Sequence, residues 1–249
     1  MKAYNHLFWI VAILLIATGC GKDDEPDVVI EPPVFNLQKS SAVEAVDLGL
    51  SVLWSNCNLG ASSTTDYGGY FAWGDPTGAL WSGAGIGYDD QGYSWNTDNY
   101  GGNNPPADIS GGELDVVSVH WGDGWRMPTY AEMKELRTQC EWTLLEQGGT
   151  KWFEVTGPNG NSINLPVAGL YYDPTAYENA RFRGGPAHVN KGAFYWTSTV
   201  SWSQNDLRGY EIHPGVVTAW CLLVEIEGRN YYLDYLRAFH MSIRPVHNK

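Results

Sequence analysis

The sequence predicts an α+β domain built from short, irregular strands, long loops and one main helix. Three observations favour this class. Only the segment that starts at Thr129 combines a helix-start signal with a helical apolar repeat. The other apolar segments are short and rich in aromatic and β-branched residues, as strands are. Residues 82–112 form an aperiodic run of Gly, Asn, Asp, Tyr and Trp, too long for an ordinary connection, so we expect a functional or a mobile loop there.

The main helix is expected to begin with a capping box. Thr129 precedes Glu132 by three residues, the spacing at which the two side chains satisfy each other's backbone N–H groups. Met133, Leu136 and Cys140 follow at three- and four-residue steps, which places them on one face. We expect this face to point into the core, with Cys140 at the end of the helix.

Strand signals occupy most of the remaining chain. Residues 46–54 alternate loosely and are expected to form the first strand, and residues 70–75 a short aromatic strand that ends in a turn. Residues 157–161, Gly-Pro-Asn-Gly-Asn, are a hairpin turn signal. Strands are expected on both sides of this turn, at 151–155 and 162–165, and further along at 194–199, 209–212, 219–226 and 238–245.

The first 25 residues resemble the export signal of a bacterial lipoprotein. Lys2 precedes an apolar run at 7–17, which is roughly half the length of a transmembrane helix and therefore favours a signal peptide. Small residues then lead to Cys20, as in the lipobox of such proteins. That resemblance implies that Cys20 becomes the acylated (palmitate-carrying) N-terminus of the mature chain and anchors it lastingly in a membrane. A cleaved secretory signal followed by an ordinary linker is the alternative.

The lysine-led acidic run at 21–25 resembles the tag that sends Bacteroidetes lipoproteins to the outer face of the outer membrane. We therefore expect an outer-membrane, lipid-anchored protein that faces the cell exterior. The chain divides into a signal peptide at 1–19, an acidic and Pro-containing tether at 20–41, and a folded domain at 42–249.

Charge and composition exclude some partners. The formal net charge is −13, from 15 Lys and Arg against 28 Asp and Glu. Such an acidic surface repels phosphate backbones, so nucleic acid is not expected as a partner. The chain also holds 12 Trp and 15 Tyr, more than a core needs. These residues suit a surface that both stacks and hydrogen-bonds, as on a paratope or a sugar platform, although bulky filling of a β-rich core accounts for a share of them.

The cysteines and acids give few metal signals. With Cys20 taken by lipid, three cysteines remain, so one disulfide and one spare thiol are expected in an oxidising compartment. No CxxC or HExxH spacing is present, which argues against zinc. Four acids of the long loop offer calcium ligands but lack the alternation of an EF-hand, so no cofactor is expected and calcium stays a minor alternative. These acids are Asp89, Asp90, Asp98 and Asp108.

Eight short motifs in order resemble the Fibrobacter succinogenes major paralogous domain family, common in Bacteroidetes lipoproteins. The resemblance spans about residues 44–247. The motifs are VDLGL at 46–50, WSNCNLGA at 54–61, YFAWG at 70–74, WRMPT at 125–129, C-x-W at 140–142, GPNGNS at 157–162, YWTST at 195–199 and SIRPV at 242–246.

That resemblance implies a C-type lectin-like fold, in which the N- and C-terminal strands pair and one face consists of long loops. It also implies a disulfide between Cys57 and Cys140. The calcium-site motifs of the sugar-binding branch, Glu-Pro-Asn and Trp-Asn-Asp, are absent. The similar sequence Glu-Pro-Asp at 25–27 lies in the tether and cannot replace them. Calcium-dependent sugar binding is therefore not implied.

The C-terminal segment resembles the ligand face of the variable proteins of diversity-generating retroelements. Tyr, Trp and Arg suit such a face because they offer broad, rigid contact area with hydrogen bonding at the rim. An equally weighted alternative is that alternate residues of 230–236 fill the core side of a strand. The candidate ligand-binding residues are Trp202, Asn205, Asp206, Arg208, Tyr210, Tyr231, Tyr232 and Tyr235.

The sequence therefore predicts a surface-displayed binding module for a protein or glycan ligand. A structural subunit of a cell-surface complex or pilus tip is the alternative, with Cys221 as a thiol for intermolecular bonding. An enzyme is disfavoured, since no G-x-S-x-G elbow, Cys/His pair or carboxylate pair of defined spacing is present. The formylglycine-generating relatives of the fold use two cysteines near the C-terminus, where this chain has only Cys221.

Overall fold

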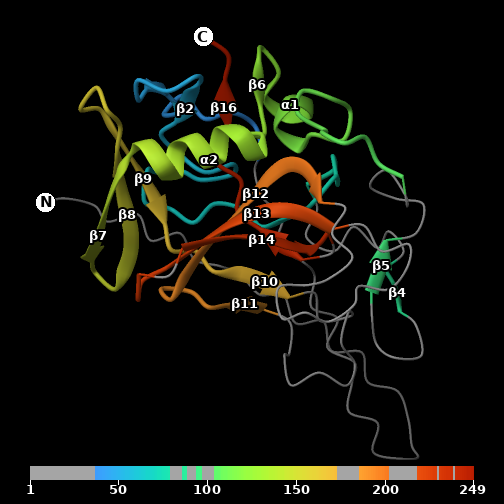
Figure 1. Cartoon of the computed structure of the whole chain (residues 1–249). Helices are drawn as coiled ribbons and strands as arrows, with labels where there is room; N and C mark the ends of the chain where they lie inside the picture. Colours follow the sequence, from blue (N-terminus) through green and yellow to red (C-terminus); the bar gives the residue numbers. More distant parts are fainter. Residues whose placement is uncertain are drawn as a thin grey trace, which may run out of the picture. The chain divides into compact units, whose positions relative to one another are not determined.

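A computed structural model describes residues 37–78, 86–88, 94–96, 104–172, 185–201, 218–228, 230–237 and 239–249. All of them belong to one compact unit, Pro32–Lys249. Within this described part, mostly antiparallel strands accompany two helices (Figure 1), which confirms the expected α+β class. Neither helix is long and apolar enough to cross a membrane. The predicted signal peptide, with Cys20, and residues 20–36 of the tether lie outside the described residues.

One sheet joins the two ends of the described domain. Its strand order is β1 (Ala45–Asp47), β2 (Leu53–Ser55), β16 (Val246–His247) and β6 (Trp125–Arg126), and every neighbouring pair is antiparallel. Trp54 pairs with Val246, so the C-terminal strand lies between the second strand and β6. The N- and C-terminal segments are therefore held in one sheet.

The expected single strand over 46–54 is wrong, because the segment folds back on itself. Val46 pairs with Trp54 in a hairpin. Gly49 has φ +79°, a conformation that glycine adopts without steric cost, and its N–H donates a 2.8 Å hydrogen bond to Asp47 Oδ1. This local turn reverses the chain where the alternation pattern suggested a continuous strand.

A second sheet has the order β11 (Gly185–Ala187), β10 (Leu170–Tyr172), β15 (His240–Met241) and β3 (Phe71–Ala72). The aromatic strand expected at 70–75 is β3, and it ends at a turn where Gly74 has φ +78°. Two further strands, β4 (Ile86–Tyr88) and β5 (Ser94–Asn96), pair with each other inside the segment expected to be a loop.

The central sheet consists of β12 (Gly192–Ser201), β13 (Thr218–Glu225) and β14 (Asn230–Leu236). The strands expected at 194–199 and 219–226 are thereby confirmed. The strand expected at 238–245 is reduced to the two residues of β15, and the one expected at 209–212 lies outside the described residues.

Each face of the central sheet packs against its own hydrophobic core. The first core includes Phe194, Trp196, Cys221 and Leu223. The second core includes Tyr195, Leu222 and Val224, together with helix α2. Successive residues along β12 and β13 therefore point alternately into the first and the second core. This period of two is what a strand covered on both faces requires.

The predicted main helix is α2, Tyr130–Gln139, and its capping box is present as expected. Thr129 Oγ1 accepts a 3.2 Å hydrogen bond from the Glu132 N–H, and Glu132 Oε2 accepts a 2.8 Å bond from the Thr129 N–H. Met133 and Leu136 are fully buried in the second core, while Cys140 caps the C-terminus and is half-buried.

A shorter helix, α1 (Val116–Trp121), was not expected from the sequence. It has only six residues, several of them β-branched, so propensity favours a strand. Asp115 starts the helix, because its buried carboxylate accepts hydrogen bonds from the Val117 and Ser118 N–H groups.

A three-stranded sheet follows α2, formed by β7 (Glu141–Gln147), β8 (Thr150–Thr156) and β9 (Ser162–Pro166). The two strands and the turn expected around 157–161 are confirmed, and β7 is an additional strand. The turn lies close against the residue that follows β1, since a Cβ at Gly157 would stand 2.1 Å from the Leu48 carbonyl oxygen. Only glycine fits at that approach.

Arg244 holds several of these elements together from the interior. Its side chain is fully buried, and its Nε donates to Asn58 Oδ1 at 3.0 Å. Nη1 donates to the Ser55 carbonyl at 2.9 Å and Nη2 to the Asn164 carbonyl. Burial lowers the pKa of this guanidinium. The closing SIRPV motif therefore carries a structural cation that links β2, β9 and the C-terminal segment.

Candidate binding surface

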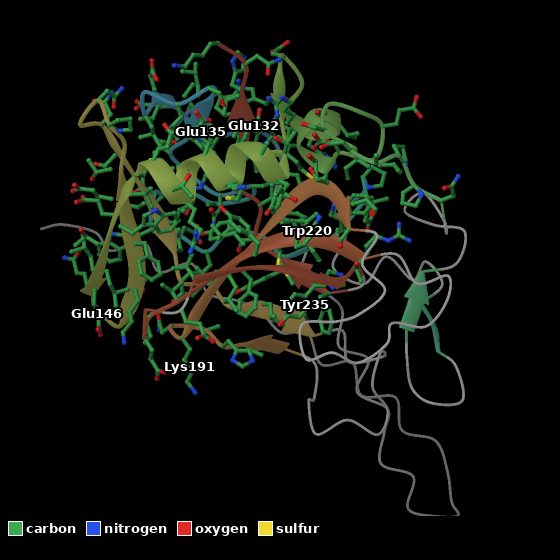
Figure 2. All side chains as sticks on the ribbon, in the orientation of Figure 1. Glu132, Glu135, Glu146, Lys191, Trp220 and Tyr235 are labelled. Atoms are coloured by element: carbon green, nitrogen blue, oxygen red, sulfur yellow. The ribbon has the colours of Figure 1, made fainter. Side chains whose placement is uncertain are left out.

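An aromatic cluster lies where the N-terminal end of α2 meets the central sheet. The ring centroids of Tyr130 and Trp220 are 5.1 Å apart, and those of Tyr130 and Tyr232 are 5.0 Å apart in an edge-to-face arrangement. Figure 2 shows Trp220 on the side of β13 that faces α2. Aromatic pairs at such distances stabilise one another beyond the area they bury.

The elements beneath the cluster fix its geometry. The register of β12 and β13 shifts between Trp196 and Val200, which is a bulge opposite Trp220. Thr197 in the bulge donates through Oγ1 to the Trp220 carbonyl at 2.8 Å. A bulge bends its strand and changes the direction of nearby side chains. The bulge in β12 therefore helps to set the orientation of Trp220 on the neighbouring strand β13.

A chain of hydrogen bonds holds Tyr130 in place. The Tyr130 N–H donates to Thr199 Oγ1 at 3.0 Å, and Thr199 Oγ1 in turn donates to Asp108 Oδ2 at 2.8 Å. The Ser198 N–H adjoins this chain and donates to the Pro128 carbonyl at 2.8 Å. The start of α2 is therefore clamped to the bulged strand.

Two polar groups of the cluster have no hydrogen-bond partner in the part of the chain that the structure describes. Tyr130 and Trp220 are both partly exposed. Among the described residues, neither the Tyr130 hydroxyl nor the Trp220 indole N–H has a hydrogen-bond partner. Amphipathic rings with a free polar group at the rim are the groups that protein interfaces and sugar platforms use.

The cluster lies at the root of the segment that carries most of the predicted ligand residues. Ser201 at the end of β12 pairs with Thr218 at the start of β13, two residues before Trp220. Residues 202–217 leave and rejoin the sheet at this pair. The predicted residues Trp202, Asn205, Asp206, Arg208 and Tyr210 lie in that segment, outside the described residues.

The three remaining predicted residues do not form one face. Tyr232 pairs with Leu222 and packs against the second core, whereas Tyr235 pairs with Ala219 and packs against the first core. Figure 2 shows Tyr235 on the opposite side of the sheet from Trp220. The backbone register pairs Tyr231 with Leu223 of the first core, and its side chain lies outside the described part. The alternative that part of 230–236 fills the core therefore applies to Tyr232 and Tyr235.

Tyr232 supports the cluster from below. Its hydroxyl donates a 3.0 Å hydrogen bond to the Met133 carbonyl of α2, and the Arg137 guanidinium lies 5.5 Å above its ring. Burial raises the pKa of this phenol, so it stays protonated as a donor. Tyr130 and Trp220, which are partly exposed, were not among the eight predicted ligand residues, although Trp220 lies in the C-terminal segment that resembles a ligand face.

An ion pair stabilises the start of α2 beside the cluster. Arg126 and Glu132 form a bidentate contact, with Nη1–Oε2 at 2.9 Å and Nη2–Oε1 at 2.5 Å. Burial alone would raise the pKa of Glu132, but hydrogen bonds from Arg126 and the Thr129 N–H outweigh it and keep the pKa below its ordinary value. Glu132 is therefore a carboxylate at neutral pH and belongs to the framework.

The described residues contain no group of three or more His, Cys, Asp or Glu that could hold a metal ion. Of the four acids considered as calcium ligands, Asp108 is engaged with the Ser110 N–H at 2.8 Å and with Thr199. The other three, Asp89, Asp90 and Asp98, lie outside the described residues.

The cysteines require a correction to the expected disulfide. Cys57 and Cys140 are not joined, and together with Cys221 they are free thiols. Their surroundings differ: Cys57 is buried behind β2 near Arg244, and Cys140 ends α2 against the second core. Cys221 is fully buried in the first core, which does not suit the intermolecular bonding considered for it.

Comparisons with known proteins give no relative for this chain: no protein-family model, no curated protein and no solved structure matches it. The α+β class and the aromatic cluster therefore rest on the sequence and structure of this chain and not on a relative.

Proposed function

We propose that this chain is a lipid-anchored binding module of the bacterial outer membrane, which displays a C-type lectin-like domain to the cell exterior. The signal motif that ends at Cys20 and the acidic run after it support the anchor and its location. The eight ordered motifs support membership of the Fibrobacter succinogenes major paralogous domain family.

Two structural features are consistent with the proposed fold. The C-terminal strand pairs with a strand near the start of the domain, Val246 with Trp54, as that fold requires. The main helix starts directly after the Arg-x-Pro-Thr segment at 126–129 and packs on the central sheet through Met133 and Leu136.

The observation that carries the proposal is the partly exposed pair of Tyr130 and Trp220 at the root of the 202–217 segment. Its two ring faces offer apolar contact area, and its hydroxyl and indole N–H offer two directional hydrogen bonds. This combination suits recognition of a protein or glycan. We assign the pair a binding role and no bond-breaking role, because no described side chain hydrogen-bonds to the Tyr130 hydroxyl to activate it as a nucleophile or general base.

An array of glycans and purified extracellular proteins, probed with the full chain in detergent, tests this function. We expect the wild-type chain to bind at least one component without added calcium. Trp220→Ala removes one of the two partly exposed rings and is expected to weaken that binding about ten-fold or more, in the range of an interface anchor. Trp202→Ala tests the predicted loop residue in the same assay.

Trp152→Ala is the matched control, since Trp152 is also a partly exposed tryptophan but lies on β8, away from the cluster. It is expected to bind like wild type. Equal binding by Trp220→Ala and Trp152→Ala would remove the cluster from the proposed site. Absence of any bound component for the wild-type chain would contradict the binding function itself.

A further inference from the structure

Strand β7 is an exposed sheet edge that the proposed ligand face does not use. Its seven residues pair with β8 in a continuous register, from Glu141 with Thr156 to Gln147 with Thr150. β7 is the outermost strand of its sheet (Figure 1), and among the described residues its backbone bonds to β8 alone. One side of the strand therefore keeps unpaired backbone groups.

The turn shows which groups these are. Gly148 and Gly149 have φ +60° and +82°, as in the two-residue turn in which the flanking residues, Gln147 and Thr150, hydrogen-bond to each other. Antiparallel pairs alternate between bonded and non-bonded, so the bonded residues of β7 are the odd-numbered ones. The N–H and C=O groups of Trp142, Leu144 and Glu146 therefore point outward.

This edge carries little of the usual protection against pairing. Edge strands are commonly shielded by charged side chains, lysine above all, and by proline, a bulge or a covering segment. β7 contains no Pro or Lys, and its register with β8 has no bulge. Its two charged residues, Glu141 and Glu146, lie toward its ends and leave the centre of the strand uncharged. Leu144 at its centre is 39% exposed, and among the described residues only it and Val119 are large hydrophobic residues exposed to this degree. By contrast, the opposite edge, β9, contains Pro166 and has its Asn164 carbonyl bound by Arg244.

We propose that β7 pairs with β7 of a second copy of this chain, antiparallel, about a twofold axis at Leu144. This is the one antiparallel register that pairs all seven residues of both strands. The outward groups of Trp142, Leu144 and Glu146 then meet the same groups of the second copy and form about six hydrogen bonds. A self-complementary patch of this kind closes as a twofold dimer.

The charges of β7 fit this register. Glu141 stands opposite Gln147 of the second copy, and Glu146 stands opposite Trp142, so no two carboxylates face each other directly. Trp142 itself packs against Phe153, with ring centroids 5.8 Å apart, and brings no charge to this pair. The exposed Leu144 side chains meet at the axis and bury each other.

Cross-linking of the full chain in detergent is the first test. Leu144→Cys places two thiols opposite each other at the axis, within the Cα separation that a disulfide tolerates. Under mild oxidation we expect a covalent dimer on a non-reducing gel. Val119→Cys is the control, because Val119 is the other exposed large hydrophobic residue but lies on α1. It is expected to stay monomeric, and equal cross-linking of the two variants would overturn the proposal.

Charge exchange provides the second test. Leu144→Lys and Leu144→Glu each bring like charges together at the axis and are expected to be monomers by analytical ultracentrifugation. An equimolar mixture is expected to recover the dimer, because opposite charges then meet. A monomeric wild-type chain, or a mixture that stays monomeric, would overturn the pairing. Neither result depends on ligand binding, so the proposed function and this pairing are tested separately.

Discussion

The hydroxyl of Tyr232 donates a 3.0 Å hydrogen bond to the carbonyl oxygen of Met133, which fastens the last strand of the central sheet to helix α2. Tyr232 also supports the ring of Tyr130 at 5.0 Å. A tyrosine that the sequence placed among ligand-binding residues thus contributes to the framework below the proposed binding surface. Binding and stability are therefore expected to respond to different aromatic residues.

Tyr232→Phe is expected to lower the free energy of unfolding by about 1 kcal/mol, the usual cost of one lost hydrogen bond. The ring remains, so the contact with Tyr130 and the arginine above it are retained. Urea unfolding measures the stability, and the glycan and protein array measures binding. Unchanged stability together with lost binding would instead make Tyr232 a ligand residue.

Arg244→Met is expected to destabilise the domain by about 3 kcal/mol or more. The substitution leaves two buried oxygens and one partly buried oxygen without their donor, and each loss at a buried site costs about 1–3 kcal/mol. These oxygens belong to Ser55, Asn58 and Asn164. Arg244→Lys is expected to recover little, because one ammonium group cannot reach all three positions. Equilibrium unfolding with both variants checks this, and a loss below 1 kcal/mol for Arg244→Met would contradict it.

The Glu132 carboxylate is expected to make the free energy of unfolding depend on pH in the acidic range. Its pKa is lowered in the folded state, so the stabilisation is fully present above its unfolded pKa, about 4.3, and is lost as pH falls through the lower folded value. The difference in unfolding free energy between wild type and Glu132→Gln should therefore be constant above about pH 5 and shrink in more acidic buffer.

Glu113→Gln is the control for removing a carboxyl group. Glu113 is exposed, and surface substitutions of this kind change the unfolding free energy by no more than about 0.5 kcal/mol. At neutral pH the unfolding free energy of this variant should therefore lie close to that of wild type. A pH-independent effect of Glu132→Gln would show that the carboxyl group acts only through its shape.

The thiols are expected to react slowly in the folded chain. Cys57 and Cys221 are buried, and burial raises the pKa of Cys140 to about 11, so little thiolate is present at pH 8. Mass spectrometry after alkylation should show all three as modifiable in denaturant without reductant and largely unmodified in the native state. A Cys57–Cys140 disulfide would instead block two of them until a reductant is added.

Local signals in the sequence predicted the elements that short-range physics controls. The capping box at Thr129 and Glu132 predicted the start of α2, and the turn residues at 157–161 predicted the β8–β9 hairpin. Where local signals pointed the other way, prediction failed. The β-branched residues of α1 favour a strand, although the buried Asp115 carboxylate stabilises a helix there. The alternation over 46–54 suggests one continuous strand, although the chain reverses at Gly49.

The exposure of Tyr130 and Trp220 in the proposed binding surface could not be predicted from the sequence, although the C-terminal segment that contains Trp220 was expected to carry a ligand face. Trp220 has the same parity as Leu222 and Val224 on β13, and Tyr130 has the spacing of Met133 on α2, so both patterns indicate core positions. Tyr130 is the first residue of α2, and Trp220 lies near the end of the central sheet, where β13 begins. The two rings meet there and are only partly covered by the rest of the domain.

The sequence by itself determined the α+β class, the main helix with its cap and the central strands, because each depends on residues close together in the chain. The tertiary structure alone decided three other matters: which faces of β14 Tyr232 and Tyr235 occupy, that the thiols stay apart, and that Tyr130 and Trp220 meet at the surface. These depend on how distant segments pack, and a one-residue change of strand register would reverse the first of them.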